Sequence, residues 1–265
     1  MAHIARKRFG QNFLHDHHII SNILGSLAYS KDQHWVEIGP GQGALTESIL
    51  TDGIQLDVVE LDRDLVRFLD FKFRNFSNLT IHSSDALKFD FSALATQGEK
   101  LHILGNLPYN ISTPLMFHLL ENTPLIADMT FMLQKEVVDR ICAEPGSKKY
   151  GRLSVMMQYY CETEHLFDVP PESFNPAPKV MSSIVRLVPH AQPPVVIDSV
   201  KSLNTVVTAA FSQRRKTLRN SLKKLILEPN IIALDIDPTI RAECLPLEDF
   251  AKLSQFVLQN PLPEE

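Results

Sequence analysis

Between residues 34 and 135, short apolar runs alternate with segments of helical periodicity. The predicted strands are HWVEI (34–38), LDVVEL (56–61), LTIHS (79–83), LHILGN (101–106) and MTFMLQ (129–134). The predicted helices between them are ALTESIL (44–50), DLVRFLDFKF (64–73) and a helix from Thr113. Strands separated by single helices are typical of βαβ units and a parallel sheet. The pattern therefore predicts an α/β fold whose ligand crevice lies at the carboxyl ends of the strands.

The second half of the chain has a different pattern. Two apolar runs, EHLFDV (164–169) and VMSSIVRLV (180–188), have no helical segment between them, which predicts an antiparallel pair at the sheet edge. Prolines then cluster, and strand patterns stop. The later segments indicate helices: SVKSLNTVVTAAF (199–211), KTLRNSLKKLIL (216–227) and EDFAKLSQFVL (248–258). We therefore predict two domains, an α/β domain over residues 1–192 and a small all-helical domain over residues 193–265.

Composition narrows the class of protein. The chain has 265 residues and is 44% hydrophobic, enough for one core and a smaller second unit. Cys142, Cys161 and Cys244 are far apart, which argues against a disulfide framework or a structural zinc site and fits a reducing cytosol. The opening residues MAHIARKRFGQNFL lack the apolar stretch of a secretory signal, and no apolar run is long enough to cross a bilayer. We expect a cytoplasmic protein with no membrane partner.

A glycine-rich turn follows the first predicted strand, in VEIGPGQGALT (36–46). Gly39, Gly41 and Ala44 match the spacing G-x-G-x-x-[GA], and Glu60 ends the next strand, where a carboxylate usually binds ribose hydroxyls. The motif indicates a nucleoside cofactor but does not separate a dinucleotide from S-adenosylmethionine. A turn made only for packing is the alternative interpretation.

Charge favours one of the two cofactors. Glu37 precedes the first glycine by two residues, and Asp85 follows the third strand. Carboxylates in this number disfavour a pyrophosphate and suit the sulfonium and ammonium groups of S-adenosylmethionine. Glu60 and Asp85 could instead cap helices, since both precede helix-like sequences.

The stretch GNLPYNIS (105–112) ends the fourth predicted strand. An exocyclic amine on adenine is a poor nucleophile, because its lone pair is delocalised into the ring, so attack needs oxygens that hold its N–H bonds. The Asn106 side-chain carbonyl can accept one N–H, and a backbone carbonyl of Leu107 or Pro108 can accept another. Tyr109 offers a flat face on which a base can stack. The alternative is a loop with an Asx-type turn and a buried tyrosine.

Taken together, the motifs of this chain resemble those of a known enzyme family. The chain resembles the ribosomal RNA adenine dimethyltransferases in an ordered set of motifs: GQNFL, VEIGPGQGALT, the acid in VVELD, SDAL, NLPYNIS and FNPAPKVMSS. More narrowly, it resembles the bacterial enzymes that dimethylate two adjacent adenosines in a hairpin loop near the 3′ end of 16S rRNA. The resemblance implies a class I S-adenosylmethionine-dependent methyltransferase core, Rossmann-like, with a seven-stranded sheet whose last strand is antiparallel. It also implies cofactor contacts, which fall on Asn12, Leu14, Gly39, Glu60, Asp85 and Asn106. Without the resemblance, Asn12 and Leu14 would be assigned to an N-terminal loop.

Two further segments concern the nucleic acid. Phe174 lies in the proline-rich PPESFNPAPKVMSS (170–183) and could clamp a flipped base opposite Tyr109; the alternative is a core residue beneath a proline loop. Between Lys201 and Leu227 there is no acidic residue. The basic residues expected to contact phosphates there are Arg214, Arg215, Lys216, Arg219 and Lys223. A solvated amphipathic helix is the alternative.

The expected partner is therefore 16S rRNA in the small ribosomal subunit, even though the formal net charge is −5. A local basic face can exist on an acidic protein. We expect a monomer without a metal, because HDHH (15–18) has no second cluster of ligands. Three alternatives remain: a resistance-type methylase of large-subunit rRNA, an RNA-binding ribosome assembly factor with secondary catalysis, and a nicotinamide dehydrogenase.

Overall fold

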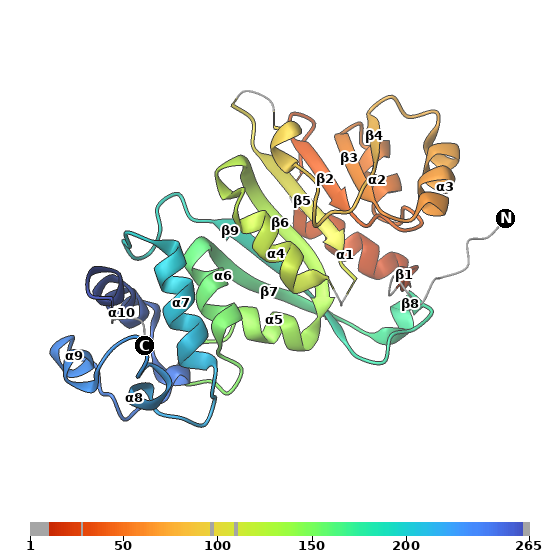
Figure 1. Ribbon diagram of the computed structural model, residues 1–265. Helices are drawn as coiled ribbons and strands as arrows, with labels where there is room; N and C mark the ends of the chain where they lie inside the picture. The colour runs from red at the N-terminus through yellow and green to blue at the C-terminus, as the bar shows by residue number, and fades with distance from the viewer. Residues whose placement is uncertain (1–10, 28, 96–97, 109–110, 262–265) are drawn as a thin grey trace. The chain divides into compact units, whose positions relative to one another are not determined.

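The computed structural model describes residues 11–27, 29–95, 98–108 and 111–261 (Figure 1). The chain divides into two compact units. The first comprises Met1–Val138 and Glu164–Pro189, and the second comprises Asp139–Thr163 and His190–Glu265. A unit division after Pro189 lies near the predicted domain boundary, but the second unit also takes in residues 139–163. The domain assignment of 1–192 and 193–265 stays a prediction.

A seven-stranded sheet has the strand order β4-β3-β2-β5-β6-β9-β7. Its strands are β2 (His34–Ile38), β3 (Gln55–Glu60), β4 (Leu79–Ser83), β5 (Leu101–Asn106), β6 (Ile126–Gln134), β7 (Cys161–Val169) and β9 (Ser182–Pro189). Strands β2 to β6 run parallel to one another, and β9 pairs antiparallel with β6. The predicted parallel sheet with an antiparallel last strand is confirmed. The central strands are mostly apolar because both of their faces are buried, but they also carry the buried carboxyl groups of Glu37, Asp57 and Glu60.

The remaining elements of the first unit are short. They are β1 (Phe13–Leu14), α1 (His17–Leu27), α2 (Thr46–Thr51), α3 (Arg63–Phe73), η2 (Phe91–Ala93), α4 (Ser112–Leu120), η3 (Thr123–Leu125), η4 (Pro171–Ser173) and β8 (Phe174–Asn175). The helix α5 (Lys135–Ile141) runs across the division between the units. In α3, the stripe Leu65, Leu69 and Phe73 is buried, as expected for an amphipathic helix on a sheet.

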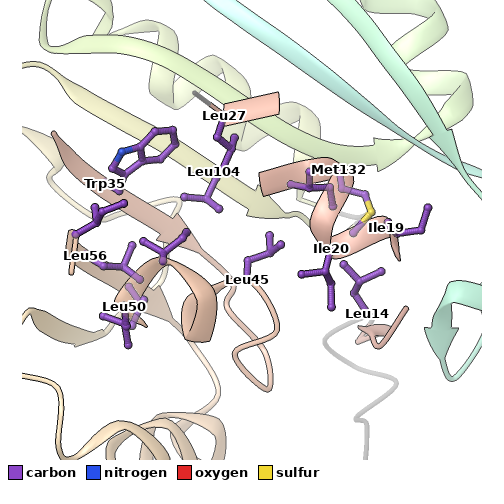
Figure 2. Packing of buried hydrophobic residues seen from close by; sticks show 14 of the residues in the cluster. Leu14, Ile19, Ile20, Leu27, Trp35, Leu45, Leu50, Leu56, Leu104 and Met132 are labelled. Atoms are coloured by element: carbon purple, nitrogen blue, oxygen red, sulfur yellow. The ribbon is translucent and has the colours of Figure 1, made fainter. Parts of the chain in front are cut away.

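The core of the first unit also includes the segment before β2. Figure 2 shows Leu14, Ile19 and Ile20 beside Met132 of β6, and Trp35 near Leu56 and Leu104. Burying side chains of this size stabilises the fold by about 1.5–3 kcal/mol each. The N-terminal residues from Leu14 to Leu27 are therefore part of the packed unit, although the sequence pattern predicted no helix there.

The direction in which successive strands are added to the sheet reverses between β2 and β5. From β2 the sheet grows through β3 and β4 on one side, and β5 then starts the other side. The two backbones are very close at this point: a Cβ placed on Gly105 would lie 2.5 Å from the Ile38 carbonyl oxygen. In open α/β sheets the ligand crevice forms outside the carboxyl ends of the strands at such a reversal.

The second unit is mainly helical. Its elements are α6 (Arg152–Tyr160), α7 (Val200–Phe211), α8 (Leu218–Ser221), α9 (Glu228–Ala233), η5 (Ala242–Cys244) and α10 (Leu247–Gln259). The helices predicted over 199–211 and 248–258 are confirmed as α7 and α10.

The continuous helix predicted over 216–227 is wrong, because only α8 is helical there. The backbone N–H of Leu218 donates to the Ile240 carbonyl at 2.8 Å, and that of Arg219 donates to the Pro238 carbonyl at 3.1 Å. Leu218 and Leu222 are still buried, as their spacing predicted. Pairing with the segment around residues 238–241 thus overrides the helical propensity of this stretch.

Candidate functional site

A pocket lies at the carboxyl ends of β2, β3 and β5, within the first unit. Carboxylates, glycines and side-chain amides from five separate segments line it. The sequence-predicted residues found there are Asn12, Leu14, Gly39, Gly41, Glu60, Asp85, Asn106, Leu107 and Pro108. The structure thus brings together residues that are up to 96 positions apart, between Asn12 and Pro108. Their individual roles stay predictions.

The glycine-rich turn has a conformation that side chains rarely adopt. Gly39 has φ of 68°, and its N–H donates to the Val59 carbonyl at 3.0 Å. Gly43 has φ of 78°, and a Cβ there would lie 2.6 Å from the Phe73 ring. Glycine at these positions lets the loop bend sharply from β2 and lie against α3. The turn therefore serves both the pocket and the packing, so the two interpretations of the motif are not exclusive.

Glu37 is a buried carboxyl group in the pocket wall, with 2% of its surface exposed. The Thr46 hydroxyl donates to Glu37 Oε2 at 2.5 Å. Burial raises the pKa of Glu37 to about 7, with a further rise from nearby Glu60, and the Thr46 hydrogen bond opposes this rise. A carboxyl group with such a pKa gains full charge near neutral pH only if a cation lies close to it.

Glu60 ends β3 and is also buried. Its Oε1 accepts the backbone N–H of Asp62 at 2.8 Å. Burial raises the pKa of Glu60, although backbone N–H groups of Asp62, Gly41 and Leu61 act against this. The N-cap of α3 is Asp62, which accepts the N–H of Asp64, so Glu60 is not the helix cap. Its position favours binding of a ligand hydroxyl group.

Asp85 follows β4 and is half-buried. Its Oδ1 accepts the N–H of Leu87 at 3.0 Å, and its carbonyl accepts the N–H of Lys88 at 2.9 Å. The residue thus closes a turn and not the helix start that the capping interpretation proposed, and it also lines the pocket. One carboxylate oxygen is enough for the turn, which leaves the other to face a ligand.

Asn106 stands at the end of β5, with its side-chain amide tied down. Its Nδ2 donates to the Asn12 carbonyl at 3.1 Å, so the amide oxygen is the group that can accept from a ligand. The Leu107 N–H donates to the Met132 carbonyl at 3.2 Å. The Pro108 carbonyl already accepts the N–H of Ile111 at 3.1 Å. Of the two backbone acceptors proposed for the amine, Leu107 is therefore the better one.

Of the two aromatic residues predicted to hold the base, the structure describes only Phe174. Tyr109 lies outside the described residues. Phe174 is 3% exposed and belongs to the hydrophobic core, and its strand β8 pairs antiparallel with β1, placing it opposite Leu14. In this arrangement the ring packs in the core, as the alternative interpretation held. The base-clamping role stays a prediction that requires the ring to leave this cluster.

Sequence reasoning missed the way in which the N-terminal segment completes the pocket. Gln11 Nε2 donates to Asp62 Oδ2 at 3.1 Å, and the Phe13 ring would contact a Cβ on Gly41 at 3.1 Å. A two-residue strand is too short to leave a periodic signal. Only the family motif GQNFL pointed to this segment.

The five predicted phosphate contacts in the second unit are exposed, but two of them have acidic partners. Arg214 Nε lies 3.7 Å from Glu243 Oε2, and Arg219 Nη1 lies 3.1 Å from Glu228 Oε1. Arg214 also donates to the Lys148 carbonyl. The other predicted phosphate contacts, Arg215, Lys216 and Lys223, are exposed as well. Acidic residues that are absent from the local sequence therefore come from elsewhere in the unit.

Two kinds of feature are absent from the described ranges, residues 11–27, 29–95, 98–108 and 111–261. No helix in them is both long and apolar enough to span a membrane. They also hold no group of three or more His, Cys, Asp or Glu side chains arranged to bind a metal ion.

A family model and two close relatives place the sequence in the same family. The family model "Ribosomal RNA adenine dimethylase" matches residues 2–259. A protein of Pseudomonas aeruginosa is 56% identical over 259 residues, covering 98% of this chain and 97% of its own length. One from Hahella chejuensis is 55% identical over 265 residues, covering 100% of this chain and 97% of its own length. Both relatives are named ribosomal RNA small subunit methyltransferase A.

Solved structures show the same fold. A dimethyladenosine transferase from Plasmodium falciparum superposes with a TM-score of 0.77 at 25% identity, over 91% of this chain and 95% of that chain. The 23S rRNA methyltransferase ErmE superposes with a TM-score of 0.70 at 24% identity, over 94% of this chain and 100% of that chain. The likeness therefore covers nearly the whole length of each protein.

Proposed function

The chain belongs to the ribosomal RNA adenine dimethylase family, and we propose that it dimethylates the exocyclic amines of two adjacent adenosines in a hairpin loop near the 3′ end of 16S rRNA. It has the fold of class I S-adenosylmethionine-dependent methyltransferases, it is an rRNA adenine dimethyltransferase, and it uses S-adenosylmethionine. The reaction belongs to small-subunit biogenesis in the cytoplasm, and the protein acts as a monomer.

The observation that carries the proposal is the position of Asn106. A hydrogen bond to the Asn12 carbonyl holds the Asn106 amide at the point where the strand order of the sheet reverses. The amide lies beside a pocket lined by the carboxyl groups of Glu37, Glu60 and Asp85. Such a pocket offers acceptors for hydroxyl and ammonium groups and repels phosphates, which argues against a dinucleotide. A nicotinamide dehydrogenase is therefore the weaker interpretation.

The residues present fit S-adenosylmethionine. Glu60 and Asp85 hold its nucleoside, and the turn at Gly39 and Gly41 lets the backbone come close without side chains. When bound, this cofactor would supply an electrophilic methyl group on a sulfonium; the lone pair of the adenine nitrogen would form the new nitrogen–carbon bond, and the electrons of the carbon–sulfur bond would leave with the sulfur.

The chain itself prepares the nucleophile. The Asn106 amide oxygen accepts one N–H of the adenine amine, and the Leu107 carbonyl accepts the other. Holding both N–H bonds away from the methyl group favours a tetrahedral nitrogen and localises its lone pair. Preorganised acceptors of this kind need no rearrangement during the reaction. No strong base is required, because the nitrogen proton becomes acidic once the methyl group is attached, and water can take it.

Methyl labelling tests this function. Small ribosomal subunits from a strain without the methyltransferase are incubated with the protein and labelled S-adenosylmethionine, and the RNA is then digested and analysed by mass spectrometry. Wild-type protein should give two dimethyladenosines in 16S rRNA. Asn106→Ala should abolish transfer and leave the dissociation constant for the subunit within about fivefold, since one neutral hydrogen bond is worth about 1 kcal/mol. Asn75→Ala, at an exposed asparagine, is the matched control.

Other results would contradict the proposal in distinct ways. Label in 23S rRNA would identify a large-subunit methylase. Loss of subunit binding in Asn106→Ala would mean that the residue supports RNA binding instead of catalysis. Normal subunit assembly in cells that carry only Asn106→Ala would make assembly, and not methylation, the principal function.

A further inference from the structure

The helix α3 has an outer face that the site described above does not use. We call the α3 outer face the surface made by Arg63, Arg67, Phe71 and Arg74, which lie within a narrow sector opposite the buried stripe of the helix. All four side chains are exposed. Figure 1 shows α3 at the periphery of the first unit, next to β4.

Phe71 is unusual in its exposure. Its side chain is 69% exposed, and it is the only aromatic residue among the large apolar side chains found exposed in the described part of the chain. The Arg74 guanidinium carbon lies 4.8 Å from the centre of the Phe71 ring. This cation–π arrangement orders both groups and leaves flat surfaces in contact with solvent.

The charges of the α3 outer face are largely available. The ion pair of Arg67 with Asp64 has 3.5 Å between Nη1 and Oδ1, and its side chains are 79% and 42% exposed, so water and salt weaken it strongly. Two carboxylates, Asp64 and Asp70, flank this sector on its two sides, against three arginines within it. Lys72 lies on another side of α3, where it donates to the Gln42 carbonyl at 3.3 Å.

We propose that the α3 outer face is a second RNA-binding surface, on which the arginines contact phosphates and Phe71 stacks on an unpaired base. The inference rests on the proposed function, because it assigns a further contact to the same RNA partner. The helix begins three residues after Glu60, so an RNA strand near the pocket can reach it. One aromatic ring among arginines matches RNA, which combines charged backbone and stacking bases, better than it matches a protein partner, whose interfaces have a contiguous apolar centre.

The test measures binding of the full chain to small ribosomal subunits that lack the modification, by filter binding at several KCl concentrations. Arg67→Ala/Arg74→Ala should weaken binding about fivefold or more and reduce the slope of log K against log salt by about 1–2, since each lost phosphate contact removes about 0.7–0.9. Phe71→Ala should weaken binding about fivefold or more with little change in slope, and Phe71→Trp should restore it. All of these side chains are exposed, so folding should not change.

The matched control is Lys31→Ala/Lys88→Ala, which removes the same charge from two exposed lysines elsewhere in the first unit. Binding of S-adenosylmethionine, measured by calorimetry, should be the same in every variant. If the wild-type protein neither binds nor methylates the subunits, the proposed function fails.

If the wild type binds and methylates but the α3 variants behave like the lysine control, only this further inference is overturned. It is also overturned if Phe71→Ala dissolves a dimer, detected by sedimentation, without changing RNA affinity. In that case the α3 outer face binds a second copy of the chain.

Discussion

Replacing Glu37 with glutamine should change how the stability of the protein depends on pH. Glu37 is 2% exposed, and its burial raises its pKa to about 7 from an ordinary value of 4.5. Glutamine has nearly the same shape and can still accept the Thr46 hydroxyl. The substitution therefore removes the titration and keeps most of the packing.

The sign follows from the direction of the shift. In the pH range from 4.5 to about 7 the folded state holds a proton on Glu37 that the unfolded state has released. The stabilisation from this proton is fully present below pH 4.5 and is lost as the pH rises through 7. A shift of this size corresponds to about 3 kcal/mol, because one pKa unit is worth about 1.4 kcal/mol and the group is almost completely buried.

The assay is urea unfolding without cofactor, at a series of pH values between 4.5 and 8. The free energy of unfolding of Glu37→Gln, minus that of the wild type, should increase by about 3 kcal/mol across this range. Comparing differences between pH values cancels any pH-independent effect of the amide. Asn75→Ala, at an exposed asparagine that carries no titratable group, is the control and should give a constant difference. Parallel curves for the wild type and Glu37→Gln would refute the reasoning.

Three further outcomes are expected. Gly105→Ala places a Cβ 2.5 Å from the Ile38 carbonyl oxygen, and it should lower the free energy of unfolding by about 1–3 kcal/mol in thermal melts; a change below about 0.5 kcal/mol would contradict this. Glu60→Gln should weaken S-adenosylmethionine binding about tenfold in calorimetry, because hydrogen bonds to a charged acceptor are the stronger ones, and unchanged affinity would remove Glu60 from the site. Lys216→Ala should reduce the salt slope of RNA binding by about 1, more than Arg219→Ala, because Arg219 already pairs with a carboxylate; equal slopes would argue against phosphate contact by Lys216.

Some elements could be predicted because their signal is local. Strand β2 and helix α3 appear in the sequence almost at their observed bounds, since an apolar run and a 3.6-residue period are properties of neighbouring residues. The glycine turn and Glu60 were placed in one crevice by topology alone, because parallel strands end at the same edge of a sheet. The motif around Asn106 indicated a functional site only because it follows a strand of the same sheet, β5.

Other features depend on contacts between distant residues. The segment 216–227 has a helical pattern, yet backbone hydrogen bonds with residues near 240 leave only α8 helical. The Asn12 carbonyl orients the Asn106 amide across 94 positions of sequence, and no local pattern reveals that bond. The residues around Phe174 alone favoured a core position and the family resemblance favoured a clamp, and burial beside Leu14 places the ring in the core.

The order of apolar runs, the glycine turn and the carboxylates along the chain determined the α/β class, the edge of the sheet that binds a ligand and the preference for a cationic cofactor. Tertiary structure decided which side chains line the pocket, which arginines have acidic partners and that burial raises the pKa of Glu37. These quantities depend on distances and burial, and a sequence pattern contains neither, because both arise only when segments far apart in the chain pack together.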